Sequence, residues 1–359
     1  MKSITFLMPP FSYSPVGGFK VVLQYANLLS EDGYDIHIVY ADSTKYRNIK
    51  WRIKYKLLLK HILFQLNIIK RSIRIWFPLD NRVKEHNVYS LDYNLVPKTD
   101  IYICTGVDTA PFLNKYPISD RRKYYFIQDY EIWGRTDKQV RETYHYSMNK
   151  IVISDWLRDI LEKEEHIKCF LVPNGFNLKE FYLTIPIEYK NKYKLSLLYH
   201  EAVRKDIKTA LKAIDIVKKR FPQVQVDVFG TPIRPNFLPE WYHYYQCPSK
   251  EQHLKINNES AIYVASSIEE GWGLTIGEAM LCGQAVACTD NRGYKEMAKD
   301  KKTALLSPTK NPDALAKNII YLINNDVVRK RIASQGLNYI KSFSEENSYR
   351  LFKSALNLI

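Results

Sequence analysis

The sequence is poor in cysteine and has no long apolar run. Its five cysteines are odd in number and no two have the spacing of a metal-binding pair, so they are typical of reduced thiols rather than of a disulfide scaffold. No apolar run reaches about 18 residues without a charge, which argues against a helix that spans a bilayer. The apolar stretch after Met1 is too short for a signal peptide. We therefore expect a cytoplasmic protein.

Acidic residues are outnumbered, with 38 Asp and Glu against 53 Lys and Arg and a formal net charge of +15. Nucleic acid, an anionic membrane surface or an anionic substrate would each explain such an excess. The excess is uneven, because residues 41–90 carry 12 Lys and Arg against three acidic residues. No known nucleic-acid-binding motif is present, so we expect no nucleic-acid partner.

The basic region contains a helical pattern. Between Lys50 and Phe77, apolar residues recur every three or four positions, basic residues fill other positions, and no Gly interrupts the run. This pattern predicts a basic amphipathic helix or helix pair within an insertion at 41–90. Such a helix either lies on an anionic membrane surface or packs on the N-terminal sheet with a solvated basic face.

The length of 359 residues suits about two domains. Residues 3–39 show the order strand, glycine loop, helix, strand, which indicates a parallel α/β sheet. Short apolar strands follow at 101–104, 124–127, 151–153 and 169–172, and a second series of strands and helices runs from 195 to 290. We predict two doubly wound domains at 1–173 and 174–340, joined near Pro173, with a C-terminal helix at 341–359 that returns to the N-terminal domain.

The most informative stretch is IEEGWGLTIGEAMLCGQAVACTDNRGYKEM at 268–297. A strand leads into a glycine loop, and a helix is expected to begin near Leu274–Thr275, where unpaired N–H groups can hold phosphate. Gly273 allows the backbone to approach a ligand closely. The carboxylates of Glu270 and Glu278 can accept hydrogen bonds from the hydroxyls of a ribose or a hexose. The alternative is an ordinary turn between strand and helix with two solvated glutamates.

This stretch resembles the donor site of glycosyltransferase family 4, whose members are retaining enzymes of the GT-B fold. The resemblance implies an α/β protein with two Rossmann-like domains that face each other across a cleft. In that family the first glutamate, here Glu270, contacts the donor sugar, and the second, here Glu278, contacts the nucleotide ribose. The backbone of Gly273, Leu274 and Thr275 would bind the diphosphate.

Two further segments are similar to the same family. SPVGGFKVV places Gly17 and Gly18 where the family's glycine pair approaches the donor phosphates. YHEAVRKD places Lys205 on the lysine of the family's phosphate clamp, with Arg204 beside it. His200 stands where an arginine of the clamp is usual, so it is a further candidate for donor binding, and an imidazole there can be neutral at pH 7. The alternative is that Arg204 and Lys205 are solvated residues near a helix start.

The stretch YYFIQDYEIWG looks like that of bacterial surface-polysaccharide enzymes that include rhamnosyltransferases. Gln128, Asp129 and Glu131 follow a buried strand, so they are candidates for the acceptor or sugar side of the site. The alternative is that Asp129 caps a turn.

The resemblance implies a retaining transfer of a sugar from a nucleotide diphosphate sugar, with a UDP- or dTDP-sugar favoured. The acceptor would be a saccharide or lipid-linked saccharide of a bacterial surface polysaccharide such as O-antigen, made at the inner face of the cytoplasmic membrane. Glu270, Lys205 and Arg204 are the expected catalytic residues. No pair of acids suits a divalent ion, so we expect no metal and no cofactor. Two alternatives are a sugar-nucleotide 2-epimerase on the same fold and a non-catalytic basic protein that binds membranes or nucleic acid.

Overall fold

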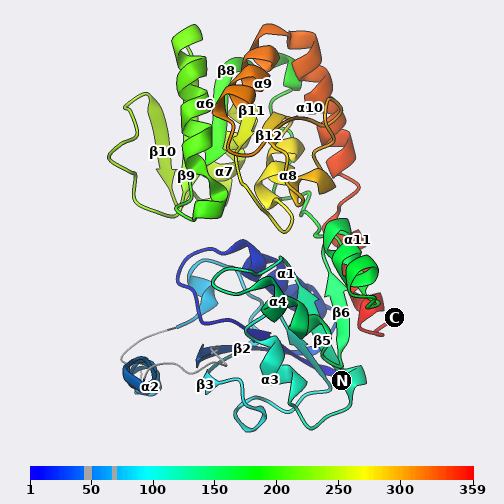
Figure 1. Cartoon of the computed structure of the whole chain (residues 1–359). Coiled ribbons are helices and arrows are strands. Elements are labelled where there is room, and N and C mark those ends of the chain that lie inside the picture. The colour runs from blue at the N-terminus through cyan, green and yellow to red at the C-terminus, as the bar shows by residue number, and fades with distance from the viewer. Residues whose placement is uncertain (44–50, 67–70) are drawn as a thin grey trace. The chain divides into compact units, whose positions relative to one another are not determined.

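The computed structural model describes residues 1–43, 51–66 and 71–359. The chain divides into two units, each with its own parallel sheet (Figure 1). The first unit comprises Met1–Val172 and Tyr349–Ile359, and the second comprises Pro173–Ser348.

The first unit is built on a seven-stranded sheet in the order β3-β2-β1-β4-β5-β6-β7, in which every neighbouring pair is parallel. Its strands are β1 (Ser3–Met8), β2 (Asp35–Ser43), β3 (Lys84–Ser90), β4 (Ile101–Cys104), β5 (Lys123–Ile127), β6 (Asn149–Val152) and β7 (Phe170–Leu171). The strands expected from the sequence are present, whereas β3 carries too little apolar sequence to be found by pattern.

Helices connect these strands. They are α1 (Gly17–Glu31), α2 (Trp51–Gln65), α3 (Ala110–Asn114), α4 (Asp137–Tyr144) and α5 (Asp155–Asp159), with α11 (Glu345–Ala355) at the end of the chain. Helix α1 forms because Phe19, Val22, Leu23 and Ala26 recur at helical spacing and are buried. Gly33 follows it with φ +87°, a left-handed conformation that glycine adopts at low cost.

The predicted basic helix is shorter than the sequence pattern suggests. Helix α2 ends at Gln65, and after the gap at 67–70 the chain forms a single 3₁₀ turn at Ile73–Ile75. Arg71, one of the basic residues of the predicted helix, is 8% exposed and its Nη1 lies 2.7 Å from Asp42 Oδ1, so it lies on neither a membrane-binding nor a solvated basic face. Its charge needs a buried partner, and the sequence pattern does not show which acid of the sheet supplies it. Lys50 and Lys70 lie outside the described residues.

The second unit is built on a six-stranded sheet in the order β10-β9-β8-β11-β12-β13, again parallel throughout. Its strands are β8 (Asn191–Leu198), β9 (Gln225–Gly230), β10 (Tyr242–Gln246), β11 (Ser260–Ala265), β12 (Ala285–Thr289) and β13 (Ala304–Ser307). Its helices are α6 (Ile207–Arg220), α7 (Lys250–Glu259), α8 (Leu274–Leu281), α9 (Pro312–Asn324) and α10 (Asp326–Ile340).

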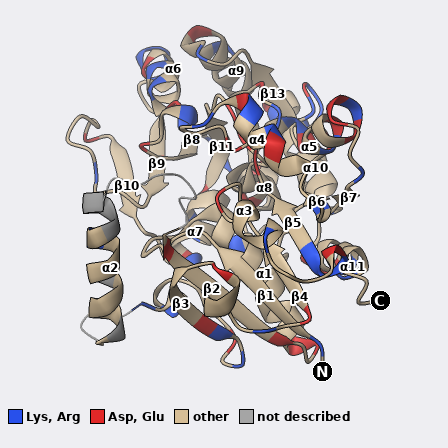
Figure 2. Ribbon diagram, turned by 60° about the horizontal axis from the view of Figure 1, so that its bottom comes forward, with Lys and Arg blue, Asp and Glu red and all other residues tan. Residues whose placement is uncertain are grey.

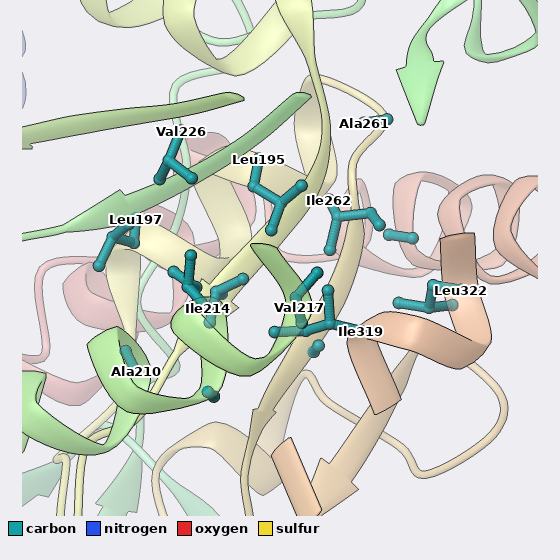
Figure 3. Packing of buried hydrophobic residues seen from close by; sticks show 14 of the residues in the cluster. Leu195, Leu197, Ala210, Ile214, Val217, Val226, Ala261, Ile262, Ile319 and Leu322 are labelled. Carbon is teal, nitrogen blue, oxygen red and sulfur yellow. The ribbon is translucent and has the colours of Figure 1, made fainter. Parts of the chain in front are cut away.

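The core of the second unit lies between this sheet and helices α6 and α9. Leu195 and Leu197 of β8 pack with Ile214 and Val217 of α6 and with Ile319 of α9 (Figure 3). All five side chains are buried. Burial of apolar surface is the dominant contribution to the stability of such a layer. This packing fixes β8 and β11 at the centre of the sheet.

Both sheets are doubly wound, as the sequence predicts. In the first unit the strand order reverses between β1 and β4, and in the second it reverses between β8 and β11. The loops after two such strands leave in opposite directions, so the carboxyl edge at this point is where an open α/β sheet binds ligands.

The C-terminal residues complete the core of the first unit. The Phe352 ring is fully buried and stacks on Tyr25 with ring centroids 4.1 Å apart. Lys353 Nζ lies 2.7 Å from Asp32 Oδ2, and the Tyr349 hydroxyl donates to the same carboxylate at 2.8 Å. The hydrogen bonds from Lys353 and Tyr349 hold the pKa of Asp32 below its usual value, although burial acts to raise it.

We expect Phe352→Ala to destabilise the first unit by about 3–5 kcal/mol, because it removes a fully buried ring and leaves a cavity. Urea unfolding followed by tryptophan fluorescence measures this. Val327→Ala, at an exposed position of the second unit, is the matched control. Equal midpoints for the two variants would show that Phe352 does not anchor the C-terminal segment.

Candidate functional site

The loops after β8 and β11 meet at the point of reversal of the second sheet. Arg204 and Lys205 end the first loop in a 3₁₀ turn, Val203–Lys205, just before α6. The backbone N–H of Ile268 donates to the Arg204 carbonyl at 2.7 Å, and Ser266 Oγ donates to the Lys205 carbonyl at 3.2 Å. These bonds join the two loops, so the sequence-distant residues Lys205 and Glu270 come together.

Glu270 lies at the centre of this arrangement. Its Oε1 accepts from Lys205 Nζ at 2.5 Å and from Ser267 Oγ at 2.6 Å, and its Oε2 accepts from Arg204 Nη1 at 3.3 Å. The residue is 7% exposed. Three of the predicted residues are thus in direct contact, and the alternative of a solvated Arg204 and Lys205 does not hold.

The charges of this cluster shift the pKa of its members. Burial acts to raise the pKa of Glu270, but the opposite charges of Lys205 and Arg204 and two hydrogen bonds outweigh it, so the net pKa is lowered. Burial, together with the same two cations, lowers the pKa of His200, so its imidazole is neutral at pH 7, as expected from the sequence. Two cationic side chains thus surround one carboxylate in this cluster.

Helix α8 begins at Leu274, where the sequence places it. Gly273 precedes it with φ +109°, and a Cβ there would lie 2.7 Å from the Tyr294 ring, so only glycine fits. No side chain caps the helix, which leaves its first N–H groups and the positive end of its dipole at this edge. Glu278 lies within the helix and is 6% exposed.

The site contains three supporting residues that were not predicted: Ser267, Asn291 and Tyr294. The Tyr294 hydroxyl donates to Ser267 Oγ at 2.9 Å, and Asn291 Nδ2 donates to the Ser267 carbonyl at 3.0 Å. A Cβ on Gly293 would lie 2.2 Å from the Glu270 carbonyl oxygen, so this glycine is required for the close approach. Only the position of Ser267, two residues after the buried strand β11, could have marked it, because the other contacts join segments more than 20 residues apart. A small pocket beside this network is lined by Lys205, Ser266, Ser267, Thr275 and Tyr294 among other residues.

The remaining predicted residues lie at the carboxyl edge of the first sheet. A Cβ on Gly18, at the start of α1, would lie 3.6 Å from the Gln128 amide, so these two residues are neighbours. Asp129 Oδ1 accepts from the backbone N–H of Tyr130, which fits a turn-capping role. Glu131 Oε2 accepts from the backbone N–H of Val107 at 2.9 Å. Gly17 is the first residue of α1.

No group of three or more His, Cys, Asp and Glu side chains in the described parts of the chain is arranged to hold a metal ion. Metal independence stays a prediction that requires a chelator experiment.

Comparison with known proteins bears directly on this site. Residues 186–339, which contain the whole cluster around Glu270, match the family model for glycosyl transferases group 1. The chain is 23% identical to the uncharacterized glycosyltransferase MJ1069 of Methanocaldococcus jannaschii, over 98% of both proteins. The chain is a glycosyltransferase.

This glycosyltransferase is also similar in sequence to a curated enzyme and in fold to a solved structure. It is 26% identical to the O-antigen chain mannosyltransferase B of Escherichia coli, over 40% of each protein. Its fold matches that of Anabaena Alr3699/HepE, solved in complex with UDP and glucose, with a TM-score of 0.72 and 16% identity over 100% of both chains. The two parallel-sheet domains thus have the architecture of GT-B glycosyltransferases.

We expect Glu270→Gln to lower the stability of the glycosyltransferase at pH 7, by an amount that shrinks as the pH falls. The folded pKa of Glu270 lies below its unfolded value, so its contribution is present above the unfolded pKa and is lost as the pH falls through the folded pKa. Thermal unfolding between pH 7 and about pH 3 measures the difference. Glu240→Gln, at an exposed position, is the control. A pH-independent difference would show that the ion pairs do not stabilise the fold.

Proposed function

We propose that this chain is a retaining glycosyltransferase of family 4 that transfers a sugar from a nucleotide diphosphate sugar to a saccharide acceptor. The observation that carries the proposal is the cluster of Lys205, Arg204 and Glu270 beside the uncapped start of α8, at the point where the strand order of the second sheet reverses. A diphosphate needs positive charge and N–H donors, and a sugar needs a carboxylate. The cluster supplies all three groups at one edge.

The chemistry follows from the charges. When the bond between the sugar and the diphosphate breaks, negative charge develops on the leaving phosphate. Lys205, Arg204 and the N–H groups at Leu274 and Thr275 are candidates to stabilise that charge, and such preorganised groups usually supply the largest part of catalysis. Lys205 is bound to Glu270 in the structure, so the same pair would hold phosphate on one side and a sugar hydroxyl on the other. Glu278 is assigned to the ribose.

For the donor we favour a UDP- or dTDP-sugar, and for the pathway a bacterial surface polysaccharide such as O-antigen. The first choice draws support from the UDP in the HepE complex and the second from the name of the similar mannosyltransferase. In this proposal Gly17 and Gly18 approach the donor phosphates, and Gln128, Asp129 and Glu131 lie on the acceptor or sugar side. No metal or cofactor takes part.

We also propose that the enzyme acts as a peripheral protein on the inner face of the cytoplasmic membrane, through α2. None of the described helices is long and apolar enough to cross a bilayer. One side of α2 contacts the first unit, where His61 lies 3.0 Å from Asp42. On the same helix, large apolar side chains that are 43–63% exposed recur at helical spacing: Tyr55, Leu58, Leu59 and Ile62. Leu66, directly after the helix, is also exposed. Lys56 is exposed beside them.

The basic excess is not confined to that helix. Lys and Arg are spread over both units, including α6 in the second (Figure 2). The exposed apolar side chains of α2 are therefore the stronger argument for membrane contact, with the general positive charge favouring an anionic surface.

The first test is a panel of UDP-, GDP- and dTDP-sugars, scored by thermal shift and slow donor hydrolysis with and without EDTA. We expect one nucleotide class to raise Tm and to be hydrolysed at an equal rate in EDTA, because cations of the protein replace a metal. Loss of turnover in EDTA would contradict metal independence. No response to any donor would contradict the proposed donor site.

Two variants separate the roles within the donor site. Glu278→Ala should weaken nucleotide binding, and Glu270→Ala should lower turnover more than nucleotide affinity.

Conversion of the donor into its 2-epimer without an acceptor would favour the epimerase instead.

For the membrane proposal we expect the triple change Leu58→Asn, Leu59→Asn and Ile62→Asn to release the protein from vesicles of phosphatidylglycerol and phosphatidylethanolamine. Each substitution removes apolar surface that would enter the lipid boundary. Flotation measures the bound fraction. A matched control replaces the exposed apolar residues Tyr189, Ile233 and Val327 by Asn. Wild-type protein that does not float would contradict membrane contact through α2.

A further inference from the structure

Tyr294 does not contact the Glu270 carboxylate, but its hydroxyl group is connected to it through one other side chain. The Tyr294 hydroxyl donates to Ser267 Oγ at 2.9 Å, and Ser267 Oγ donates to Glu270 Oε1 at 2.6 Å. All three residues are buried. The structure therefore contains a continuous chain of two hydrogen bonds that ends on the carboxylate.

The direction of this hydrogen-bond chain follows from its chemistry. The ionised carboxylate of Glu270 has no hydrogen, so Ser267 is the donor in the bond between them. A serine hydroxyl has one hydrogen, so Ser267 Oγ can only accept in its bond with Tyr294. Burial, together with the charge of Glu270, raises the pKa of Tyr294, so the phenol keeps the hydrogen that it donates.

The loop after β12 fixes the separation between Tyr294 and Ser267. Asn291 Oδ1 accepts from the Tyr294 backbone N–H at 3.0 Å, and Asn291 Nδ2 donates to the Ser267 carbonyl at 3.0 Å. Thr289 Oγ1 donates to the same carbonyl at 2.6 Å. Because these contacts hold the backbone at both residues, the loop does not need the bond between the two hydroxyl groups to keep its conformation.

The ring of Tyr294 has a role that is separate from that of its hydroxyl. A Cβ on Gly273 would lie 2.7 Å from the ring, so the ring packs directly against the residue that precedes α8. Phenylalanine would keep this packing and remove only the hydroxyl. The substitution Tyr294→Phe therefore breaks the hydrogen-bond chain without opening a cavity beside α8.

Glu270 depends on several groups to stay ionised where it is buried. Burial is the largest influence on its pKa and acts to raise it, whereas the charges of Lys205 and Arg204 and the hydrogen bond from Ser267 act to lower it. The other titratable groups that interact with its charge are His200, Tyr263 and Tyr294. Ser267 is thus the uncharged donor that supports the ionised form.

We propose that Tyr294 is a positioning residue for glycosyl transfer, whose hydroxyl acts through Ser267 to hold Glu270 Oε1 in place and so to keep Oε2 in a fixed direction. The inference rests on the proposed function, in which Glu270 contacts the donor sugar and Lys205 also holds phosphate. Phosphate shares the positive charge of Lys205, so Ser267 becomes more important as a donor to Glu270 when the nucleotide sugar is bound. Tyr294 keeps the Ser267 hydroxyl turned towards the carboxylate.

The first experiment needs no donor. The side-chain carboxyl carbon of Glu270 is followed by ¹³C NMR in the whole chain, from about pH 7 downwards, and is assigned with Glu270→Gln. We expect the carboxyl group to titrate at a higher pH in Tyr294→Phe than in the wild type, because the Ser267 hydroxyl loses the bond that orients it. Ser267→Ala should shift the titration in the same direction.

The double variant tests whether Tyr294 acts through Ser267. Once Ser267→Ala has removed the connecting hydroxyl, adding Tyr294→Phe should leave the titration of Glu270 unchanged. Two residues that act through one contact are expected to have such non-additive effects, whereas independent residues have additive ones.

Turnover is measured as release of the nucleotide from UDP-glucose, UDP-N-acetylglucosamine, GDP-mannose and dTDP-rhamnose. Tyr294→Phe should lower kcat about five- to tenfold, which corresponds to the loss of one neutral hydrogen bond. The KM of the donor should stay close to the wild-type value, because the groups proposed to hold the diphosphate are unchanged. The acidic limb of the kcat profile should move to higher pH together with the carboxyl titration.

Tyr242→Phe is the matched control. It removes the hydroxyl of another buried tyrosine of the second unit, on β10, and this hydroxyl has no hydrogen-bond partner in the part of the chain that the structure describes. The variant should keep the wild-type kcat, pH profile and Glu270 titration. Thermal unfolding of both tyrosine variants shows whether each is folded under the conditions of the assay.

A wild-type titration of Glu270 in Tyr294→Phe would overturn the proposal, and so would a further shift in the double variant. A rise in the KM of the donor with unchanged kcat would also overturn it, because Tyr294 would then act on donor binding. A wild type that releases no nucleotide from any of the four donors contradicts the proposed function. In that case the titrations still decide whether Tyr294 acts on Glu270 through Ser267.

Discussion

The ion pair between Lys205 and Glu270 is the contact on which the carboxyl edge of the second sheet depends. It joins the loops after β8 and β11, and these two strands are the neighbours between which the sheet order reverses. Ser267, held by Tyr294 and Asn291, fixes the carboxylate from one side, and Gly293 allows the chain to pass against its backbone. A buried carboxylate without its cations would destabilise the fold, so the conformation of both loops depends on this ion pair.

Two carboxyl groups, one at the carboxyl edge of each sheet, have pKa values shifted in opposite directions. In the second unit, two cations keep Glu270 ionised despite its burial. In the first unit, Glu131 has no such contact, and burial holds its proton close to neutral pH. The pKa of the carboxyl group is thus lowered at one edge and raised at the other.

Most strands and the start of α8 could be predicted from the sequence, because their signals lie within short stretches of the chain. Apolar runs marked the buried strands, and the glycine loop with its following helix marked the start of α8 at Leu274. What the sequence did not reveal depends on contacts between distant segments. The apolar period continued past Gln65, yet the chain leaves the helix after that residue, and Arg71 is buried against Asp42 of β2.

The same limit applies to the site. The contact of Glu131 with Val107 and that of Tyr294 with Ser267 each join residues more than 20 positions apart. No periodicity encodes such pairs, whereas the neighbours Arg204 and Lys205 were visible as a charged dipeptide before a helix. The sequence therefore located the loops correctly but could not show which side chains within them touch.

The position of Phe352 has a consequence for how the protein is made. The ribosome completes residues 1–172 first, yet their core lacks the ring that stacks on Tyr25 until α11 has been synthesised. The nascent first unit must therefore keep an apolar face uncovered while the whole second unit is translated and folds. A chain that ends before α11 would have a first unit whose core lacks the Phe352 ring.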